Sequence, residues 1–215
     1  MTYQACIFDL DGVITDTAHY HHMAWRQLAK SVDVDFTTAD NHQLKGVGRM
    51  ESLEYILAKA SRGYSDDEKA ALAQQKNQHY KLLINNVSPD DTLPGIRQSL
   101  DWLRASGWKV GLASSSHNAL QVISSLGLSN VFDYVANAAS IPRGKPAPDI
   151  FLDVAAAFNI EPSNCIGVED ASAGVSAIKS ANMFAIGIGD RQILAEADIV
   201  MPTPEDLTAY LRSIS

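Results

Sequence analysis

Two aspartates near the N-terminus are the first residues whose type and spacing suggest chemistry. Asp9 and Asp11 follow the apolar run "ACIF" and are separated by one leucine. If that run continues as a strand, residues two apart point to the same side and lie roughly 6.6 Å apart along the chain. Two carboxylates so close repel each other unless a cation or a proton intervenes. The pair therefore predicts a bound cation, a proton-transfer group, or both.

Further polar residues stand at the ends of two other apolar runs and just before a helical stretch. They are of the types that bind phosphate or metal: Ser114, Ser115, Ser116, Asn118, Lys145, Glu169 and Asp170. Each one alone has an ordinary structural explanation, such as a helix N-cap or a solvated charge. In a parallel α/β sheet, however, ligands bind outside the carboxyl ends of the strands. Together these residues predict one site at that edge.

Phosphoryl transfer through a carboxylate nucleophile fits this set of acids, hydroxyls and a lysine. We expect Asp9 to attack phosphorus, and Asp11 to donate a proton to the leaving oxygen and accept one from an attacking hydroxyl. Ser114 and Lys145 are expected to stabilise the transferring group. Mg²⁺ is the expected cofactor, held through carboxylate or backbone oxygens by Asp9, Asp11, Glu169 and Asp170.

Three other motifs for metals or nucleotides do not fit the sequence. Counted from Asp9, an EF-hand loop needs glycine sixth and glutamate twelfth, but Gly12 is fourth and Tyr20 is twelfth. Gly187 and Gly189 are not followed by the third glycine of a dinucleotide fingerprint, and no G-x-x-x-x-G-K-S/T motif occurs. Calcium, dinucleotide and P-loop sites are therefore not expected.

Composition and charge narrow the classes of partner. The chain of 215 residues has 17 Lys and Arg against 25 Asp and Glu, and this net charge of −8 argues against a nucleic-acid or anionic membrane surface. Cys6 and Cys165 lie inside apolar runs, which indicates buried thiols and a reducing compartment. No apolar run approaches the roughly 18 residues of a membrane span, and the start lacks the features of a secretion signal. We expect a cytoplasmic protein, with nothing that demands a dimer.

The elements that must position these residues follow an α/β pattern. Four apolar runs predict buried strands, at 5–8, 109–114, 165–168 and 184–189. Beyond residue 95 they alternate with helical stretches, at about 96–106, 118–126, 148–158, 171–181 and 204–213. This alternation predicts a doubly wound, mainly parallel sheet.

A long helical stretch separates the first strand from that alternation. Residues 16–88 show helical periodicity and no convincing strand, and a segment of this length is too long for a loop in a compact domain. We expect an all-helical cap domain at 16–88, inserted into a core domain of residues 1–15 plus 89–215. The hinges are expected at 13–17 and 86–94.

The motifs resemble those of the haloacid dehalogenase superfamily. Its pattern of D-x-D-G, a Ser or Thr after the second strand, a downstream Lys and a late acidic pair is similar to "FDLDGVITDT", "LASSSHN", "KPAPDIF" and "GVEDASAG". The resemblance spans the whole chain and implies a Rossmann-like core with an inserted cap. The second aspartate, Asp11, implies a phosphotransferase, because the dehalogenases of the superfamily lack it.

Within the superfamily the chain resembles the β-phosphoglucomutases in particular, also through "LKGVGRMESL" and "KN". This resemblance implies the interconversion of β-D-glucose 1-phosphate and D-glucose 6-phosphate through an aspartyl phosphate. It also implies glucose 1,6-bisphosphate as intermediate and primer. A bisphosphate that turns around in the site needs a second phosphate pocket, which the resemblance places at Arg49, Ser116 and Asn118. Arginine offers a two-pronged donor for phosphate.

The resemblance also assigns residues around the sugar. It implies that His21 positions Asp11 when the cap closes, with the help of Lys76. The residues implied to line the sugar are Trp25, Gly46, Val47 and Ser52, and Ser115 is expected to bind the substrate as well. The alternative explanations are that Trp25 and Val47 belong to the cap core and that Lys76 is a solvated charge.

Two departures from the mutase pattern concern the cap loop and the second phosphate pocket. His117 stands where some mutases have lysine, which weakens the grip on phosphate unless the imidazole is protonated. Gly48 and Met50 replace more polar residues.

Two alternative functions remain open. One is a sugar-phosphate phosphatase, in which water replaces the sugar hydroxyl. The other is a non-catalytic protein that binds phosphosugars.

Overall fold

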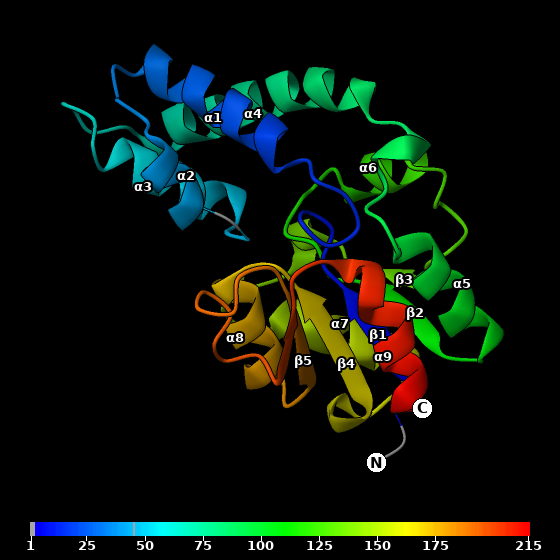
Figure 1. Ribbon diagram of the computed structural model, residues 1–215. Coiled ribbons are helices and arrows are strands. Elements are labelled where there is room, and N and C mark those ends of the chain that lie inside the picture. Colours follow the sequence, from blue (N-terminus) through cyan, green and yellow to red (C-terminus); the bar gives the residue numbers. More distant parts are fainter. Residues whose placement is uncertain (1–2, 45) are drawn as a thin grey trace.

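A parallel sheet of six strands forms the base of the molecule (Figure 1). The computed structural model describes residues 3–44 and 46–215; Lys45, in the "LKGVGR" stretch, lies outside the described residues. The strands are β1 (Ala5–Phe8), β2 (Lys109–Leu112), β3 (Tyr134–Val135), β4 (Cys165–Glu169), β5 (Phe184–Ile188) and β6 (Ile199–Met201). Their order is β3-β2-β1-β4-β5-β6, and every neighbouring pair is parallel. The predicted doubly wound parallel sheet is confirmed.

Strand β1 lies at the centre of the sheet because its sequence can be buried on both faces. All four residues of "ACIF" are fully buried, and the strand pairs with β2 on one side and β4 on the other. Continuous apolar runs are typical of strands in a parallel sheet covered on both faces. The sequence prediction missed β3 and β6. They are edge strands of two and three residues, too short to show a pattern.

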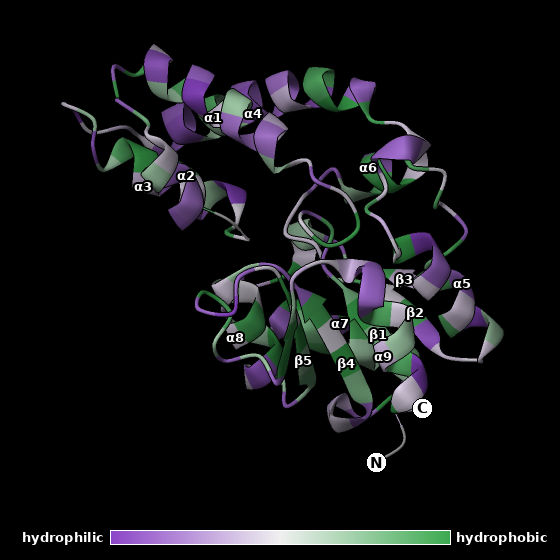
Figure 2. Ribbon diagram, viewed as in Figure 1, coloured by the Kyte–Doolittle hydropathy of each residue, from purple (hydrophilic) through white to green (hydrophobic). Residues whose placement is uncertain are grey.

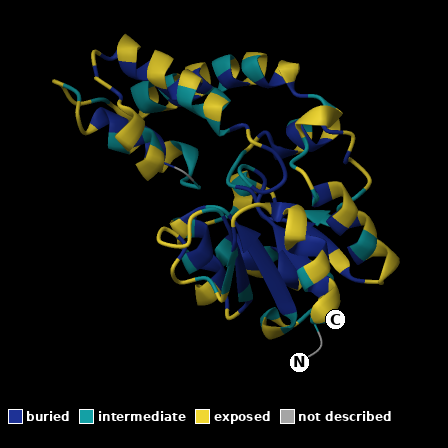
Figure 3. Ribbon diagram, in the orientation of Figure 1, coloured by how far each residue is buried: buried dark blue, intermediate teal, exposed yellow. Residues whose placement is uncertain are grey.

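Helices cover both faces of the sheet. They are α5 (Ile96–Ala105), α6 (Ala119–Ser125), α7 (Asp149–Phe158), α8 (Ser172–Ser180) and α9 (Leu207–Ser213). Apolar residues of α5, α6 and α9 pack in one cluster, and those of α7 and α8 pack in another on the opposite face. In Figure 2 the strands between them are largely hydrophobic, and in Figure 3 the central strands are largely buried. Short 3₁₀ turns complete the connections, at Ile84–Asn86, Pro89–Asp91, Ala138–Ser140, Pro162–Asn164 and Pro204–Asp206.

Four helices follow β1 and lie above the sheet in Figure 1. They are α1 (Ala18–Ser31), α2 (Thr38–Gln43), α3 (Arg49–Leu57) and α4 (Asp66–Leu83). Residues of α1, α3 and α4 pack in an apolar cluster of their own, which includes Trp25, Leu28 and Ile56. The described part of 16–88 contains no strand, as expected for a helical insertion. No helix in the described ranges is long and apolar enough to cross a membrane.

The chain passes between the sheet and these helices through two segments that lie side by side. The Leu93 amide donates to the Ile14 carbonyl at 2.9 Å, and the Thr15 hydroxyl donates to the Asp91 carbonyl at 2.8 Å. Thr15 also forms an antiparallel bridge with Thr92. The two expected hinge segments are therefore tied to each other.

Candidate active site

A cavity lies between the four N-terminal helices and the carboxyl ends of the strands. The predicted site residues that line it are Asp9, Asp11, His21, Trp25, Gly46, Val47, Arg49, Ser52, Lys76, Ser114, Ser115, Ser116, Asn118 and Asp170. Lys145 and Glu169 are completely buried next to Asp9. Gly48 and Met50 are not among the lining residues, so these departures lie outside the cavity wall.

Asp9 is fixed at the end of β1 by the neighbouring strand and by Lys145. Its amide donates to the Val168 carbonyl on β4 at 2.9 Å. Lys145 Nζ lies 2.5 Å from Asp9 Oδ1 and 2.7 Å from Glu169 Oε2. Burial lowers the pKa of Lys145, but the two carboxylates outweigh this effect and raise it above its usual value. A permanent positive charge therefore lies beside the Asp9 carboxylate.

Glu169 holds Lys145 in place, and both oxygens of its carboxylate accept hydrogen bonds. Its second oxygen, Oε1, accepts from the amides of Asp170 and Ala171 at 3.1 and 3.2 Å. A Cβ at position 174 would lie 1.9 Å from Glu169 Oε2, so Gly174 leaves the space that this buried carboxylate occupies.

Three carboxylates form a group that suits a hard divalent cation. One oxygen from each of Asp9, Glu169 and Asp170 lies within 4.8 Å of the others. Gly12 makes room for Asp170, because a Cβ at this position would lie 2.0 Å from Asp170 Oδ2, and its φ of +81° favours glycine. Carboxylate oxygens are the ligands that Mg²⁺ prefers, so the residues present fit this ion.

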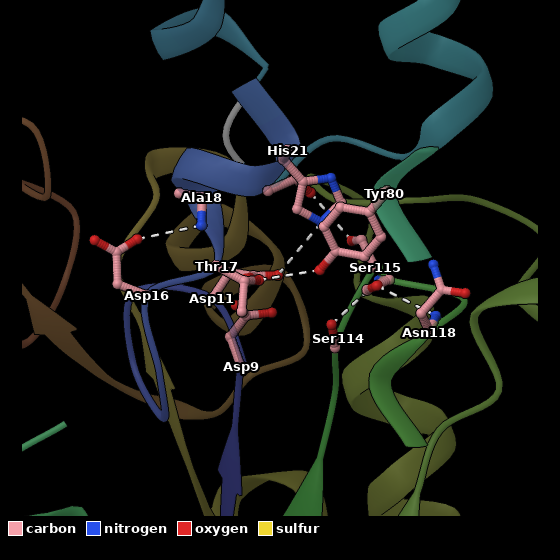
Figure 4. Close-up of polar contacts among 12 residues, drawn as sticks. Asp9, Asp11, Asp16, Thr17, Ala18, His21, Tyr80, Ser114, Ser115 and Asn118 are labelled. Atoms are coloured by element: carbon pink, nitrogen blue, oxygen red, sulfur yellow. Dashed lines mark hydrogen bonds and ion pairs between the residues drawn. The ribbon is translucent and has the colours of Figure 1, made fainter. Parts of the chain in front are cut away.

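The side chain of Asp11 turns toward the helices (Figure 4). The Thr17 hydroxyl donates to Asp11 Oδ1, and His21 Nε2 lies 3.9 Å from Asp11 Oδ2. Burial and the negative charge of Asp9 raise the pKa of Asp11 to about 7, although the Thr17 hydrogen bond acts in the opposite direction. Asp11 is therefore able both to donate and to accept a proton near neutral pH.

Lys76 and His21 form a buried pair above Asp11. Lys76 Nζ lies 2.8 Å from His21 Nδ1, and only 3% of Lys76 is exposed. Burial and the charge of Arg49 lower the pKa of Lys76 to about 7, and burial and Lys76 hold the pKa of His21 well below its usual value. A neutral His21 accepts from Lys76 at Nδ1, and its Nε2–H then faces Asp11. Lys76 is therefore not a solvated charge.

Sequence reasoning missed one residue that supports this group. The ring of Tyr80 on α4 stacks on His21 at 4.0 Å between centroids, and its hydroxyl lies 3.0 Å from Thr17 Oγ1. Tyr80 is fully buried. The one signal in the sequence is its spacing of four from Lys76, which places both residues on one face of a helix.

The serine run after β2 is ordered by its own hydroxyls. The Ser116 amide donates to Ser114 Oγ at 3.1 Å, and the Asn118 amide donates to Ser116 Oγ at 3.2 Å. Ser115 instead donates from Oγ to the Gly46 carbonyl at 3.1 Å. One hydroxyl of the run thus joins the sheet to the loop before α3.

Asn118 stands at the N-cap of α6, but its side chain does not cap the helix. It donates from Nδ2 to Asn77 Oδ1 on α4 at 2.7 Å. Sequence reasoning gave Asn77 no role, and the structure places it on the cavity wall.

Arg49 and His117 line the same cavity, and the charge of Arg49 acts on the His117 imidazole. Burial and Arg49 lower the pKa of His117, against a smaller opposite effect of Glu51. His117 is therefore neutral near neutral pH, and Arg49, at the start of α3, supplies the cationic side chain of this wall.

Trp25 belongs to the apolar cluster of the N-terminal helices and also borders the cavity. It is 4% exposed. Lys76 Nζ lies 4.4 Å from the centroid of its ring system.

Comparisons with known proteins match most of the chain to a single family. A family model described as haloacid dehalogenase-like hydrolase matches residues 3–182. The β-phosphoglucomutase of Bacillus subtilis is 46% identical over 97% of this chain and 93% of that protein. The phosphorylated carbohydrates phosphatase of Thermotoga maritima is 28% identical over 98% of this chain and 99% of that protein. A crystal structure of β-phosphoglucomutase from Clostridium difficile is 46% identical, with a TM-score of 0.96 over 99% of this chain and 96% of that chain.

Proposed function

The chain belongs to the haloacid dehalogenase-like hydrolase family, and from this premise we propose that it is a sugar phosphomutase that interconverts β-D-glucose 1-phosphate and D-glucose 6-phosphate. One observation carries this choice of reaction. Arg49, Ser116 and Asn118 line the same cavity as Asp9, so the cavity offers groups for a second phosphate besides the one being transferred. A phosphatase needs no such second site.

Asp9 and Asp11 divide the chemistry between them. Asp9 forms a bond to phosphorus while the bond from phosphorus to the sugar oxygen breaks, and Asp11 gives its proton to that oxygen. In the second half of the cycle, ionised Asp11 takes the proton of the attacking sugar hydroxyl, and the phosphoryl group leaves Asp9. The pKa of Asp11, about 7, suits both halves.

Lys145 and Ser114 support the nucleophile. Lys145 donates a hydrogen bond to Asp9 and offers its positive charge to the transferring phosphoryl group. Ser114, which is 2% exposed, offers a hydroxyl at the adjoining wall. Both are held rigidly, which reduces the reorganisation needed in the transition state.

Magnesium is the cofactor of this proposal. The carboxylates of Asp9, Glu169 and Asp170, which lie close together, would hold it. The backbone carbonyl of Asp11 is proposed as a further ligand. When bound, Mg²⁺ neutralises charge on the phosphoryl oxygens and so allows an anionic nucleophile to approach.

The cap is proposed to comprise residues 16–88 and the core residues 1–15 plus 89–215. Trp25, Gly46, Val47, Ser52, Lys76 and Ser115 would surround the sugar. Glucose 1,6-bisphosphate would act as intermediate and primer, turning around between Asp9 and Arg49. A closed cap keeps water from the phosphoenzyme, which separates a mutase from a phosphatase.

We further propose a cytoplasmic monomer whose partner is a small phosphorylated sugar. The net charge of −8 argues against nucleic acid or an anionic membrane as partner. Cys6 and Cys165 are both buried free thiols, consistent with a reducing compartment.

A primed mutase assay tests the function. With β-glucose 1-phosphate, Mg²⁺ and a trace of glucose 1,6-bisphosphate, the enzyme should form glucose 6-phosphate with little free phosphate. Asp9→Asn is the control, since it should form no phosphoenzyme. Release of one phosphate per sugar would instead support a sugar-phosphate phosphatase, the activity named for the Thermotoga maritima relative.

A further inference from the structure

We propose that Asn77 is a positioning residue: it orients the Asn118 amide toward the second phosphate and so links binding of that phosphate to closure of the cap over the core. This inference rests on the proposed function, because it concerns the second phosphate pocket. Asn77 lies on α4 and Asn118 directly precedes α6, so the contact joins the two parts of the chain that form the cavity.

The geometry makes Asn77 the partner of the Asn118 side chain. Asn118 Nδ2 donates to Asn77 Oδ1 at 2.7 Å, and Asn118 is only 6% exposed. The Asn118 side chain makes no capping bond to α6. A buried amide without a hydrogen-bond partner costs free energy. Loss of the Asn77 oxygen would therefore leave Asn118 Nδ2 without its acceptor.

The chemistry of the carboxamide explains why its orientation matters. An asparagine side chain carries two N–H donors on one end and a carbonyl acceptor on the other. Asn77 holds one N–H of Asn118, and because Asn118 lines the cavity, the second N–H is left for an anion bound there. A flipped amide would present its carbonyl oxygen, which repels phosphate. Asn77 thus selects the orientation that binds phosphate.

The same bond connects ligand binding to cap position. It exists only while α4 lies against the segment before α6, so opening the cavity would break it. A phosphate on Asn118 stabilises the orientation that the closed form requires, and the closed form stabilises phosphate binding. Such coupling is reciprocal by thermodynamic linkage.

The chain contains a matched contact that serves as a control. Gln121 Nε2 on α6 donates to Asn85 Oδ1, just beyond α4, at 3.2 Å. This bond joins the same two regions through the same chemical groups, but it is exposed and neither residue lines the cavity. Asn85→Ala therefore removes a bridging amide contact without touching the phosphate pocket.

The experiment compares wild type, Asn77→Ala and Asn85→Ala in the full chain. The apparent KM for glucose 1,6-bisphosphate and the free phosphate released per glucose 6-phosphate formed are measured. Phosphorylation of Asp9 by acetyl phosphate is measured in parallel, because this donor carries no second phosphate. Asn77→Ala should raise the KM about three- to tenfold and increase phosphate release, as expected for one lost hydrogen bond. Its labelling by acetyl phosphate, and all properties of Asn85→Ala, should stay within about twofold of wild type.

Several outcomes would overturn the inference. One is an unchanged KM in Asn77→Ala; another is an equal loss with acetyl phosphate, which would indicate a general structural defect. A double-mutant cycle adds a further check, since Asn77→Ala should raise the KM no further in an Asn118→Ala background. If the wild type only hydrolyses sugar phosphates, the proposed mutase function fails instead, and this result is separate from the behaviour of the variants.

Discussion

Asp11 owes its two proposed roles to the residues packed around it. Burial and the charge of Asp9 raise its pKa to about 7, whereas the hydrogen bond from Thr17 opposes this rise. Asp11 is then present in both protonation states at neutral pH, as a group that alternates between acid and base must be.

The two half-reactions should depend on pH in opposite directions. Phosphorylation of Asp9 by glucose 1,6-bisphosphate needs protonated Asp11, so its rate should fall as the pH rises above about 7. Attack of the sugar hydroxyl on the phosphoenzyme needs ionised Asp11, so its rate should fall as the pH drops below about 7. Rapid-quench single-turnover measurements of each step would reveal the two limbs.

Asp11→Asn provides the control for this prediction. It should abolish both limbs and slow turnover by about 10²- to 10⁴-fold, the usual contribution of general acid–base catalysis. Two half-reactions that respond to pH in the same direction would assign the proton transfers to another group.

The sequence alone predicts where many of the site residues lie, because these residues directly follow strands. Asp9, Ser114 and Asp170 stand where apolar runs end, and parallel strands bring those ends to one edge of a sheet. The contacts of Asn77 and Tyr80 were not predictable, since each joins residues far apart in the sequence. A helical pattern predicts on which face of the helix a residue lies, but it does not predict which distant residue that side chain contacts.

At the scale of elements, the loop that carries Gly46 and Val47 and leads to Arg49 depends on the helices beside it. Helix α2 begins with a capping box in which Thr37 and Asp40 satisfy each other's backbone amides. Asp40 also accepts hydrogen bonds from Tyr55 on α3 and from Lys59 just beyond it. These bonds tie the two helices that flank the loop.

Asp40 should stabilise the protein in a pH-dependent way. Lys59, followed by the Thr37 amide, holds the pKa of Asp40 well below its usual range. The stabilisation is therefore complete above the pKa of the unfolded chain, about 4, and is lost as the pH falls further. Asp40→Asn should lower the urea midpoint at neutral pH, and the difference from wild type should shrink at about pH 3.

A nearby aspartate offers the comparison for that measurement. Asp35 is exposed and precedes α2, so Asp35→Asn should leave the midpoint close to that of wild type at both pH values. A constant difference between Asp40→Asn and wild type at both pH values would show that the charge of Asp40 contributes nothing.

The strands illustrate what sequence patterns reveal about elements. Strands β1, β2, β4 and β5 were predictable because their apolar residues are buried among neighbours on both sides. The edge strands β3 and β6 are short and partly buried, and they form because a neighbouring strand offers hydrogen bonds. Such strands are too short to show a recognisable hydrophobic pattern in the local sequence.

At the scale of the whole molecule, the cavity exists only because two parts of the chain face each other. The sheet supplies the nucleophile and the cation-binding acids, and the four helices supply Arg49, His21 and Lys76. The proposed mutase reaction needs both walls, whereas formation of the phosphoenzyme from a donor with a single phosphate needs chiefly the wall of the sheet.

Removal of the Arg49 side chain should impair the mutase reaction but not the formation of the phosphoenzyme from a donor with a single phosphate. Arg49→Ala should reduce mutase turnover by about tenfold or more, because a paired guanidinium–phosphate contact is lost. Labelling of Asp9 by acetyl phosphate should persist. Arg49→Lys should recover only part of the turnover, since lysine lacks the two-pronged donor geometry. Unchanged turnover in Arg49→Ala would place the second phosphate elsewhere.

The paired segments near Thr15 and Asp91 have a consequence for how such proteins diversify. The four helices enter and leave the sheet at adjacent points, where the hydrogen bonds of Thr15 and Leu93 hold the two crossings together. An insertion with neighbouring ends can be lengthened, shortened or exchanged while the strands keep their places. Selection is then free to remodel the wall that contacts the sugar while the carboxylates at the sheet remain as they are. The same chemistry thereby becomes available to new substrates.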